Sequence, residues 1–328
     1  MEAIIREKLQ GIKFGDVQVY NHVAVIPIVG ANGSGPKYLT LKDALANNLL
    51  IITEIDDGGH VPELKVNNKA AMPVFLLDGE ELAGAKQNRV LNTTILLREK
   101  AETIIPVSCT EQGRWSYSSA RFSESGHVMS AKLRATKNAS VHESLKSDRA
   151  YRSNQGAVWD GIVCMSRLHD VSSETGAMKD ILDARQKHLD KYLENLPLVP
   201  HQTGFVVLVN GQIAGMDIIS RPEAFAQLHP KLIRSYVMDA LTEKVAWGEY
   251  DYRQVADAFL AKILECEEQQ FASVGYGNDY RYEGKKIVGS ALVHENAVIH
   301  MAFFQVTEAE KAGNMSSASR RRAYRTRQ

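Results

Sequence analysis

The sequence predicts an α+β fold, with a β-rich N-terminal half, a helical C-terminal half and two returning β-hairpins. Three observations lead to this prediction. Short apolar runs separated by turn residues fill the first 110 residues, and apolar residues at helical spacing dominate after Trp159. Two pairs of apolar runs, each joined by turn residues, interrupt these predicted helices. The 328 residues suffice for one large domain or two modest ones. We expect a single interlocked α+β domain over residues 14–304.

The first part of this domain, residues 14–111, is expected to form a compact antiparallel or mixed sheet. The apolar run 23–29 predicts a buried strand. Thr40 can cap a short helix in which Asp43 supplies the acidic half of a capping box. Further short strands are expected at 49–55, 61–66, 73–78, 90–97 and 103–108.

Residues 112–158 differ in character, because they are poor in apolar residues and locally basic. We expect this stretch to be a polar, basic connection, since a long polar segment inside a compact protein is often a lid or an oligomer arm. Short helices are expected within it near 129–138 and 141–148.

Residues 159–304 are expected to be helical with two hairpins. Apolar stripes predict three amphipathic helices, which begin near Met178, Pro230 and Tyr252. Asn210-Gly211 lies between two apolar runs and predicts the turn of the first hairpin. Residues 294–296 predict the turn of the second.

Polar groups concentrate between residues 79 and 115, a segment that we call the polar window. Strand pairing does not require them, whereas amide and guanidinium donors beside glycines suit a phosphate or sugar ligand. The alternative interpretation is a buried polar network that holds two hairpins together. The ligand-binding candidates are Lys86, Gln87, Asn88, Arg89, Gln112 and Arg114.

Three further residues of the polar window are candidates for catalysis. An arginine near Cys109 would lower its thiol pKa, but no histidine lies in the window to act as a base, so a buried inert cysteine is the favoured interpretation. Glu80 and Glu111 can supply carboxylates for hydrolysis of a glycosidic bond or for magnesium. Alternatively, a glutamate pairs with Arg89 or Arg114. We assign no metal site from the sequence, and the sequence leaves the cofactor unknown.

The composition excludes several classes of protein. Lys plus Arg equals Asp plus Glu at 39 each, so the net charge does not indicate binding to nucleic acid or membrane. Three distant cysteines without a CxxC pair argue against a disulfide scaffold and a structural zinc site. Since no apolar run approaches the ~20 residues of a membrane span and the cysteine pattern favours the reducing cytosol, we expect a soluble cytoplasmic protein.

The C-terminal segment, residues 311–328, has a composition of its own. It contains Lys and Arg residues but no Asp or Glu, and it has almost no apolar residues. Such a segment cannot offset the entropy of ordering, so we expect a disordered tail. The alternative is an electrostatic arm for nucleic acid or for an acidic partner.

The runs 73–97 and 106–115, with the motif DGEELAGAKQNR, resemble a known family. This family is the ARG and rhodanese-phosphatase-superfamily-associated protein domain, a domain of unknown function. The resemblance extends from about Phe14 to Phe304. The family name records association with ADP-ribosylglycohydrolases and with rhodanese and phosphatase domains, which implies by context a role near nucleotide or ADP-ribose metabolism. The resemblance implies no catalytic residues.

These observations lead to three hypotheses about function. The leading hypothesis is that the protein binds an ADP-ribose-like nucleotide, and it leaves open whether the protein also processes this ligand. In this hypothesis Lys86 and Arg89 contact phosphate, and Gln87 and Asn88 contact the sugar or the base. The second is a non-catalytic scaffold that forms a homo-oligomer through its basic connection. The third is nucleic-acid binding by this connection and the tail, which the alternating aromatic and basic residues of 114–122 favour.

Overall fold

The computed structural model describes residues 1–30, 33, 35–56, 62–246 and 248–307. The fold is broadly α+β, but the predicted division into a β-rich half and a helical half is wrong. Helices are scattered along the described chain, and most strands of its largest sheet come from residues 202–305. The predicted tail at 311–328 lies outside the described residues.

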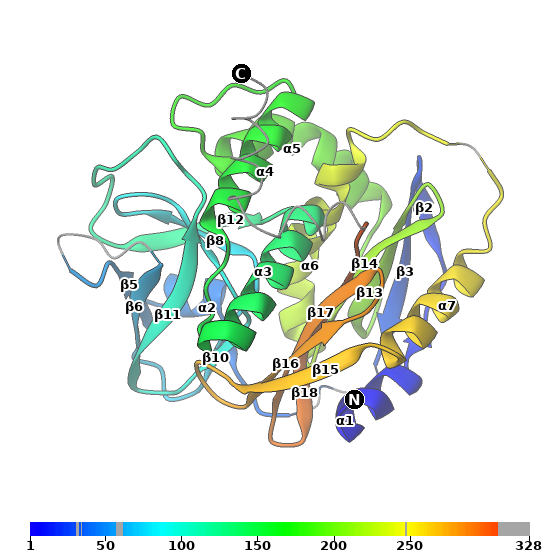
Figure 1. Ribbon diagram of the computed structural model, residues 1–328, viewed down its shortest axis with the longest axis horizontal. Helices are drawn as coiled ribbons and strands as arrows, with labels where there is room; N and C mark the ends of the chain where they lie inside the picture. The colour runs from blue at the N-terminus through cyan, green and yellow to red at the C-terminus, as the bar shows by residue number, and fades with distance from the viewer. Residues whose placement is uncertain (31–32, 34, 57–61, 247, 308–328) are drawn as a thin grey trace.

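The large sheet is antiparallel and forms one side of the molecule (Figure 1). Its spatial order is β1-β3-β13-β14-β18-β17-β16-β15, with β2 paired to β3. The bounds of its strands are β1 Lys13–Phe14, β2 Gln18–Tyr20, β3 Val23–Val29, β13 Gln202–Val209, β14 Gln212–Ile219, β15 Glu267–Ala272, β16 Asn278–Glu283, β17 Ile287–His294 and β18 Ala297–Gln305.

Both predicted hairpins are confirmed, and they form the centre of this sheet. β13 pairs with β14 across Asn210 and Gly211, which have φ of 50° and 73°. β17 pairs with β18 across Glu295 and Asn296, with φ of 48° and 54°. Positive φ at both central residues gives the turn a twist that matches the twist of the strands.

Strands β15 and β16 explain much of the error in the predicted fold class. Their sequences, EEQQFA and NDYRYE, lack a run of apolar residues, and the segment that contains β16 resembles a glycine-punctuated loop. In the structure, Asp279 and Arg281 of β16 are buried and bind each other, with 2.5 Å between Arg281 Nε and Asp279 Oδ1. A hydropathy pattern cannot reveal a strand that buries an ion pair.

The polar window belongs to two smaller sheets on the other side of the molecule. The second sheet has the order β12-β8-β9-β11-β6-β5, and the small sheet has the order β10-β7-β4. Their bounds are β4 Leu39–Thr40, β5 Leu50–Thr53, β6 Glu63–Asn68, β7 Val74–Leu76, β8 Glu80–Gly84, β9 Arg89–Leu91, β10 Ile95–Leu97, β11 Ala101–Cys109 and β12 Phe122–Val128. They enclose an apolar core of their own, which includes Leu64, Leu82 and Ile105.

Helices cover both faces of the large sheet. Figure 1 shows α3, α4, α5 and α6 between the large sheet and the second sheet, and α1 and α7 on the outer face of the large sheet. The helices are α1 Ala3–Gln10, α2 Leu41–Ala46, α3 Ala131–Asp148, α4 Gln155–Leu168, α5 Met178–Asn195, α6 Pro222–Ala240 and α7 Tyr252–Leu264. No helix of the described residues is both long enough and apolar enough to cross a membrane.

Residues at the helix N-terminus determine where two of these helices begin. Thr40 caps α2 as predicted, because its side chain accepts a hydrogen bond from the Asp43 amide at 3.2 Å. The helix expected to begin at Pro230 instead begins at Pro222. Proline suits the first turn of a helix, because the backbone N–H groups there have no hydrogen-bond partner within the helix and the missing N–H of proline costs nothing. Pro230 lies inside α6.

Residues 112–158, which we expected to be a polar connection, contain β12, all of α3 and the start of α4. The two short helices expected there are one continuous helix of 18 residues. Arg134, Lys137 and Asn138 of α3 are almost fully buried, so this polar sequence belongs to a core helix.

Gly79 lies where the polar window contacts α3. Its φ is +85°, which favours glycine, and a Cβ at this position would come within 2.9 Å of Arg134 Cγ. Gly126 has nearly the same φ, +84°, but a Cβ there would contact nothing within 4 Å.

We therefore expect Gly79→Ala to destabilise the protein more than Gly126→Ala does. Gly126→Ala should lower the unfolding free energy by about 1 kcal/mol, through backbone strain alone. Gly79→Ala should lower it by roughly 2–4 kcal/mol, because Arg134 must also move. Urea denaturation of both variants measures the difference, and equal losses would show that the close contact with Arg134 is unimportant.

Candidate functional site

The inner end of the polar window, by which we mean Gly79 and Glu80 together with the preceding Asp78, joins a network of buried charges. Asp78 binds Lys137 and lies 3.6 Å from Arg134 Nε. Arg134 in turn holds Asp217 with two hydrogen bonds, Nη1–Oδ2 at 2.9 Å and Nη2–Oδ1 at 2.8 Å. Each of these four side chains is at most 1% exposed. Such a bidentate pair is strong and directional.

Asp217 is the most heavily bonded member of this network. Its carboxylate also accepts a hydrogen bond from the Tyr236 hydroxyl at 2.7 Å and lies 3.1 Å from His300 Nε2. Burial alone would raise the pKa of the Asp217 carboxyl, but Arg134 and His300 outweigh burial and lower this pKa to about 2. Asp217 is therefore a structural anion at neutral pH.

Glu80, a predicted catalytic residue, is ion-paired inside the protein. One of its oxygens binds the Lys231 ammonium, and the other accepts a hydrogen bond from the Leu77 amide at 2.9 Å. Lys231 also binds Glu124, with 2.5 Å between Nζ and Oε1. The arrangement ties β8 and β12 to α6.

Glu111 and Arg114 form the second predicted group, together with Asn88. Arg114 donates two hydrogen bonds to the Glu111 carboxylate, from Nε at 2.9 Å and from Nη2 at 2.6 Å. The backbone amide of Asn88 and the Thr175 hydroxyl also donate to this carboxylate. Burial would raise the pKa of Glu111, but these donors outweigh it and lower the pKa below its ordinary value.

Arg89 contacts Cys109, the third predicted catalytic residue. Its Nη1 lies 2.6 Å from Cys109 Sγ and 2.8 Å from Gln87 Oε1. Burial raises the pKa of the Cys109 thiol even though Arg89 opposes this effect. The thiol is therefore protonated at neutral pH, which does not suit a nucleophile.

Arg89 also faces Glu54, a residue that the sequence did not suggest. Its Nη2 lies 3.7 Å from Glu54 Oε1, and both side chains are buried. Neither Glu54 oxygen makes a hydrogen bond to the described residues, and the same holds for Nε and Nη2 of Arg89. The two residues are 35 positions apart in the sequence, and the strand order β5-β6-β11-β9 brings them together.

The outer end of the polar window, by which we mean Lys86 and Trp115 together with the nearby Tyr117, presents aromatic rings above a cation. Lys86 Nζ lies 5.4 Å from the ring centroid of Trp115 and 5.1 Å from that of Tyr117. The Arg89 guanidinium carbon lies 5.8 Å from the Trp115 centroid. The two rings are 49% and 51% exposed, whereas Lys86 is buried. This is the cation–π geometry.

The predicted site residues thus come together only in part. Gln87, Asn88, Arg89 and Glu111 are buried and bonded to their neighbours. Gln112 is exposed and lines a separate cavity of about 230 Å³ with Trp159 and Ser173. Among the described residues, no three His, Cys, Asp or Glu side chains are grouped as a metal ion would require.

Trp115 and Tyr117 were not among the predicted ligand-binding residues. The signal for them is present in the sequence, because both lie in the run of aromatic and basic residues from 114 to 122. Lys86 is 29 positions before Trp115, so only the fold shows that the cation and the ring meet.

The family of the chain is established by a comparison. The model of the ARG and Rhodanese-Phosphatase-superfamily-associated Protein domain matches residues 11–304. The chain belongs to this family. The match confirms the resemblance, and it covers the described structure from β1 to the end of β18 except for the last residue of that strand. No curated protein and no solved structure matches the chain.

Glu81 of the family motif gives a test of the buried part of the window. Its side chain is fully buried and accepts a hydrogen bond from the Thr110 hydroxyl at 2.6 Å. Burial raises the pKa of Glu81 to about 7, although Thr110 opposes this effect. The folded protein therefore keeps a proton that the unfolded chain loses, so this group makes stability fall as pH rises.

We expect Glu81→Gln to remove this pH dependence. Between pH 4.5 and 7, the unfolding free energy of the native protein should fall relative to that of the variant, by at most about 3 kcal/mol. Above pH 7 the difference should stay constant. Urea denaturation of both proteins across this range measures it. A difference that does not change with pH would mean that Glu81 ionises normally in the folded protein.

Proposed function

We propose that the protein binds an ADP-ribose-like nucleotide at the outer end of the polar window. One observation supports this most: the Lys86 ammonium lies beneath Trp115 and Tyr117, two aromatic rings that are each about half exposed. A nucleotide has a flat base and an anionic phosphate, and these groups match an exposed ring and a cation, respectively.

The chemistry of the surrounding groups suits the rest of such a ligand. Arg114 is partly exposed and provides a second cation at the same edge. Arg89 adds positive potential from below the Trp115 ring.

Binding is better supported than processing. Lys231 pairs with the Glu80 carboxylate, Arg114 pairs with the Glu111 carboxylate, and burial keeps the Cys109 thiol protonated. A general acid or base must reach the substrate within hydrogen-bonding distance. Processing by Glu111 would therefore require Arg114 to exchange the carboxylate for a ligand phosphate.

We expect ADP-ribose to stabilise the protein through Trp115 and Lys86. At about 100 times the dissociation constant, the ligand should raise the unfolding free energy by roughly 2.7 kcal/mol. Trp115→Ala and Lys86→Ala should each weaken binding by roughly 10-fold, because base stacking and desolvated phosphate contacts are of this size. Urea denaturation with and without ADP-ribose measures the change in unfolding free energy, and isothermal titration calorimetry measures the loss of affinity in the variants.

Tyr276→Ala provides the matched control, since Tyr276 also packs against a cation, with the Arg98 guanidinium carbon 4.7 Å from its ring. This variant should bind ADP-ribose like the native protein. A panel of AMP, ADP, ADP-ribose and a short single-stranded oligonucleotide distinguishes the nucleotide from nucleic acid. Binding that survives both Trp115→Ala and Lys86→Ala would place the ligand elsewhere, and tighter binding of the oligonucleotide would favour the nucleic-acid hypothesis.

A further inference from the structure

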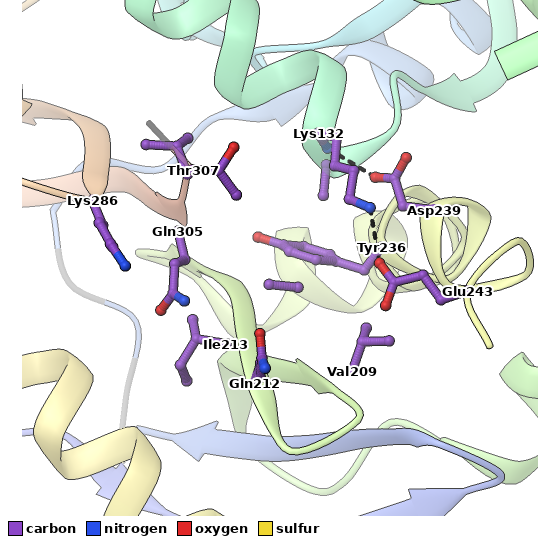
Figure 2. A pocket seen from close by; sticks show the side chains of 13 residues that line it. Lys132, Val209, Gln212, Ile213, Tyr236, Asp239, Glu243, Lys286, Gln305 and Thr307 are labelled. Atoms are coloured by element: carbon purple, nitrogen blue, oxygen red, sulfur yellow. Dashed lines mark hydrogen bonds and ion pairs between the residues drawn. The ribbon is translucent and has the colours of Figure 1, made fainter. Parts of the chain in front are cut away.

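A second cavity, of about 350 Å³, lies outside the polar window. Its walls come from the start of α3, the β13–β14 hairpin, the end of α6, the turn between β16 and β17, and the end of β18 (Figure 2). Segments from five parts of the sequence thus meet around it. The volume is in the range of small-molecule sites.

One side of this cavity is acidic. The Asp239 carboxylate accepts a hydrogen bond from the Lys132 amide at 2.8 Å, and the Glu243 carboxylate lies 2.8 Å from Lys132 Nζ. Burial raises the pKa of Asp239 to about 6, although the Lys132 amide and ammonium oppose this effect. At pH 8, which is above this pKa, Asp239 is ionised, so the single Lys132 ammonium faces two acidic side chains.

The opposite side is basic and amide-rich. Figure 2 shows Lys286 and Gln305 across the cavity from Asp239 and Glu243, with the Tyr236 ring between the two sides. The cavity is therefore bipolar, with a negative end and a positive end, and the lining between them includes the apolar Ile213 and Ala214.

The walls are fixed before any ligand arrives. The Tyr236 hydroxyl is held by Asp217 at 2.7 Å, and its ring stacks on Phe304 with 6.3 Å between centroids. The Val306 amide donates to the Lys286 carbonyl at 2.9 Å, which ties the end of β18 to the turn that carries Lys286. A preformed site loses less entropy when a ligand binds.

We propose that this cavity binds a small molecule with an amine at one end and a carboxylate at the other, such as an ω-amino acid. The amine would contact Asp239 and Glu243, and the carboxylate would contact Lys286 and Gln305. An aliphatic body would lie along Ile213 and Ala214 between the two ends. A ligand with only one of the two charges would leave the other end of the cavity unmatched.

Three compounds of equal length test this proposal: 6-aminohexanoate, hexylamine and hexanoate. Calorimetric titration at pH 8 should show that 6-aminohexanoate binds about tenfold more tightly than either singly charged compound. Lys286→Met should remove its advantage over hexylamine, and Glu243→Gln should remove its advantage over hexanoate. Lys285→Met is the control, because Lys285 is the exposed neighbour of Lys286 and does not line the cavity.

Equal affinity for the three compounds, or no binding by any of them, would overturn the proposal. So would a preference for 6-aminohexanoate that both Lys286→Met and Glu243→Gln leave unchanged. The Lys286 side chain is exposed, and the hydrogen bond that ties this residue to Val306 uses the Lys286 backbone carbonyl, so Lys286→Met should fold normally. This variant therefore tests the proposal even if Glu243→Gln disturbs the fold by removing the Glu243–Lys132 ion pair. Circular dichroism of each variant checks this.

Discussion

The buried Arg134–Asp217 ion pair is the interaction on which the rest of the structure depends. Asp217 belongs to the large sheet and Arg134 to α3, and Asp78, which lies close to Arg134, immediately precedes the polar window. Three parts of the chain therefore meet at one guanidinium. Breaking a buried ion pair by removing one partner is strongly unfavourable, because the other charge stays buried without compensation. The sheets can accordingly take only an arrangement that keeps these charges together.

This constraint gives a structural role to the start of the family motif. Asp78 binds Lys137, Gly79 leaves room for Arg134, and Glu80 binds Lys231. Later in the window, Thr93 donates to Asp279 at 2.9 Å and Thr94 lies 2.8 Å from His300 Nδ1, so further polar residues link it to the large sheet. The alternative interpretation, a buried polar network, thus describes the inner end of the window, and we place the proposed nucleotide at its outer end.

The sequence predicted the structure correctly where neighbouring residues determine it. The Thr40 cap, the Asn210-Gly211 turn and the apolar strand β3 follow from backbone preferences and hydropathy alone. The same reasoning failed for α3 and β16, whose inward faces carry Arg134, Lys137, Asp279 and Arg281. It also could not find the Glu54–Arg89 contact or the position of Lys86 beneath Trp115, because partners distant in sequence are brought together only by strand order and loop path.

A double-mutant cycle on Arg134 and Asp217 tests the central claim most directly. Urea denaturation would compare Arg134→Met, Asp217→Asn and the double variant with the native protein. Each single change should lower the unfolding free energy by about 3–5 kcal/mol, and the double variant should lose less than the sum by roughly 1–3 kcal/mol. Single losses below about 1 kcal/mol that add without coupling would contradict the account, since the pair would then not hold the sheets together.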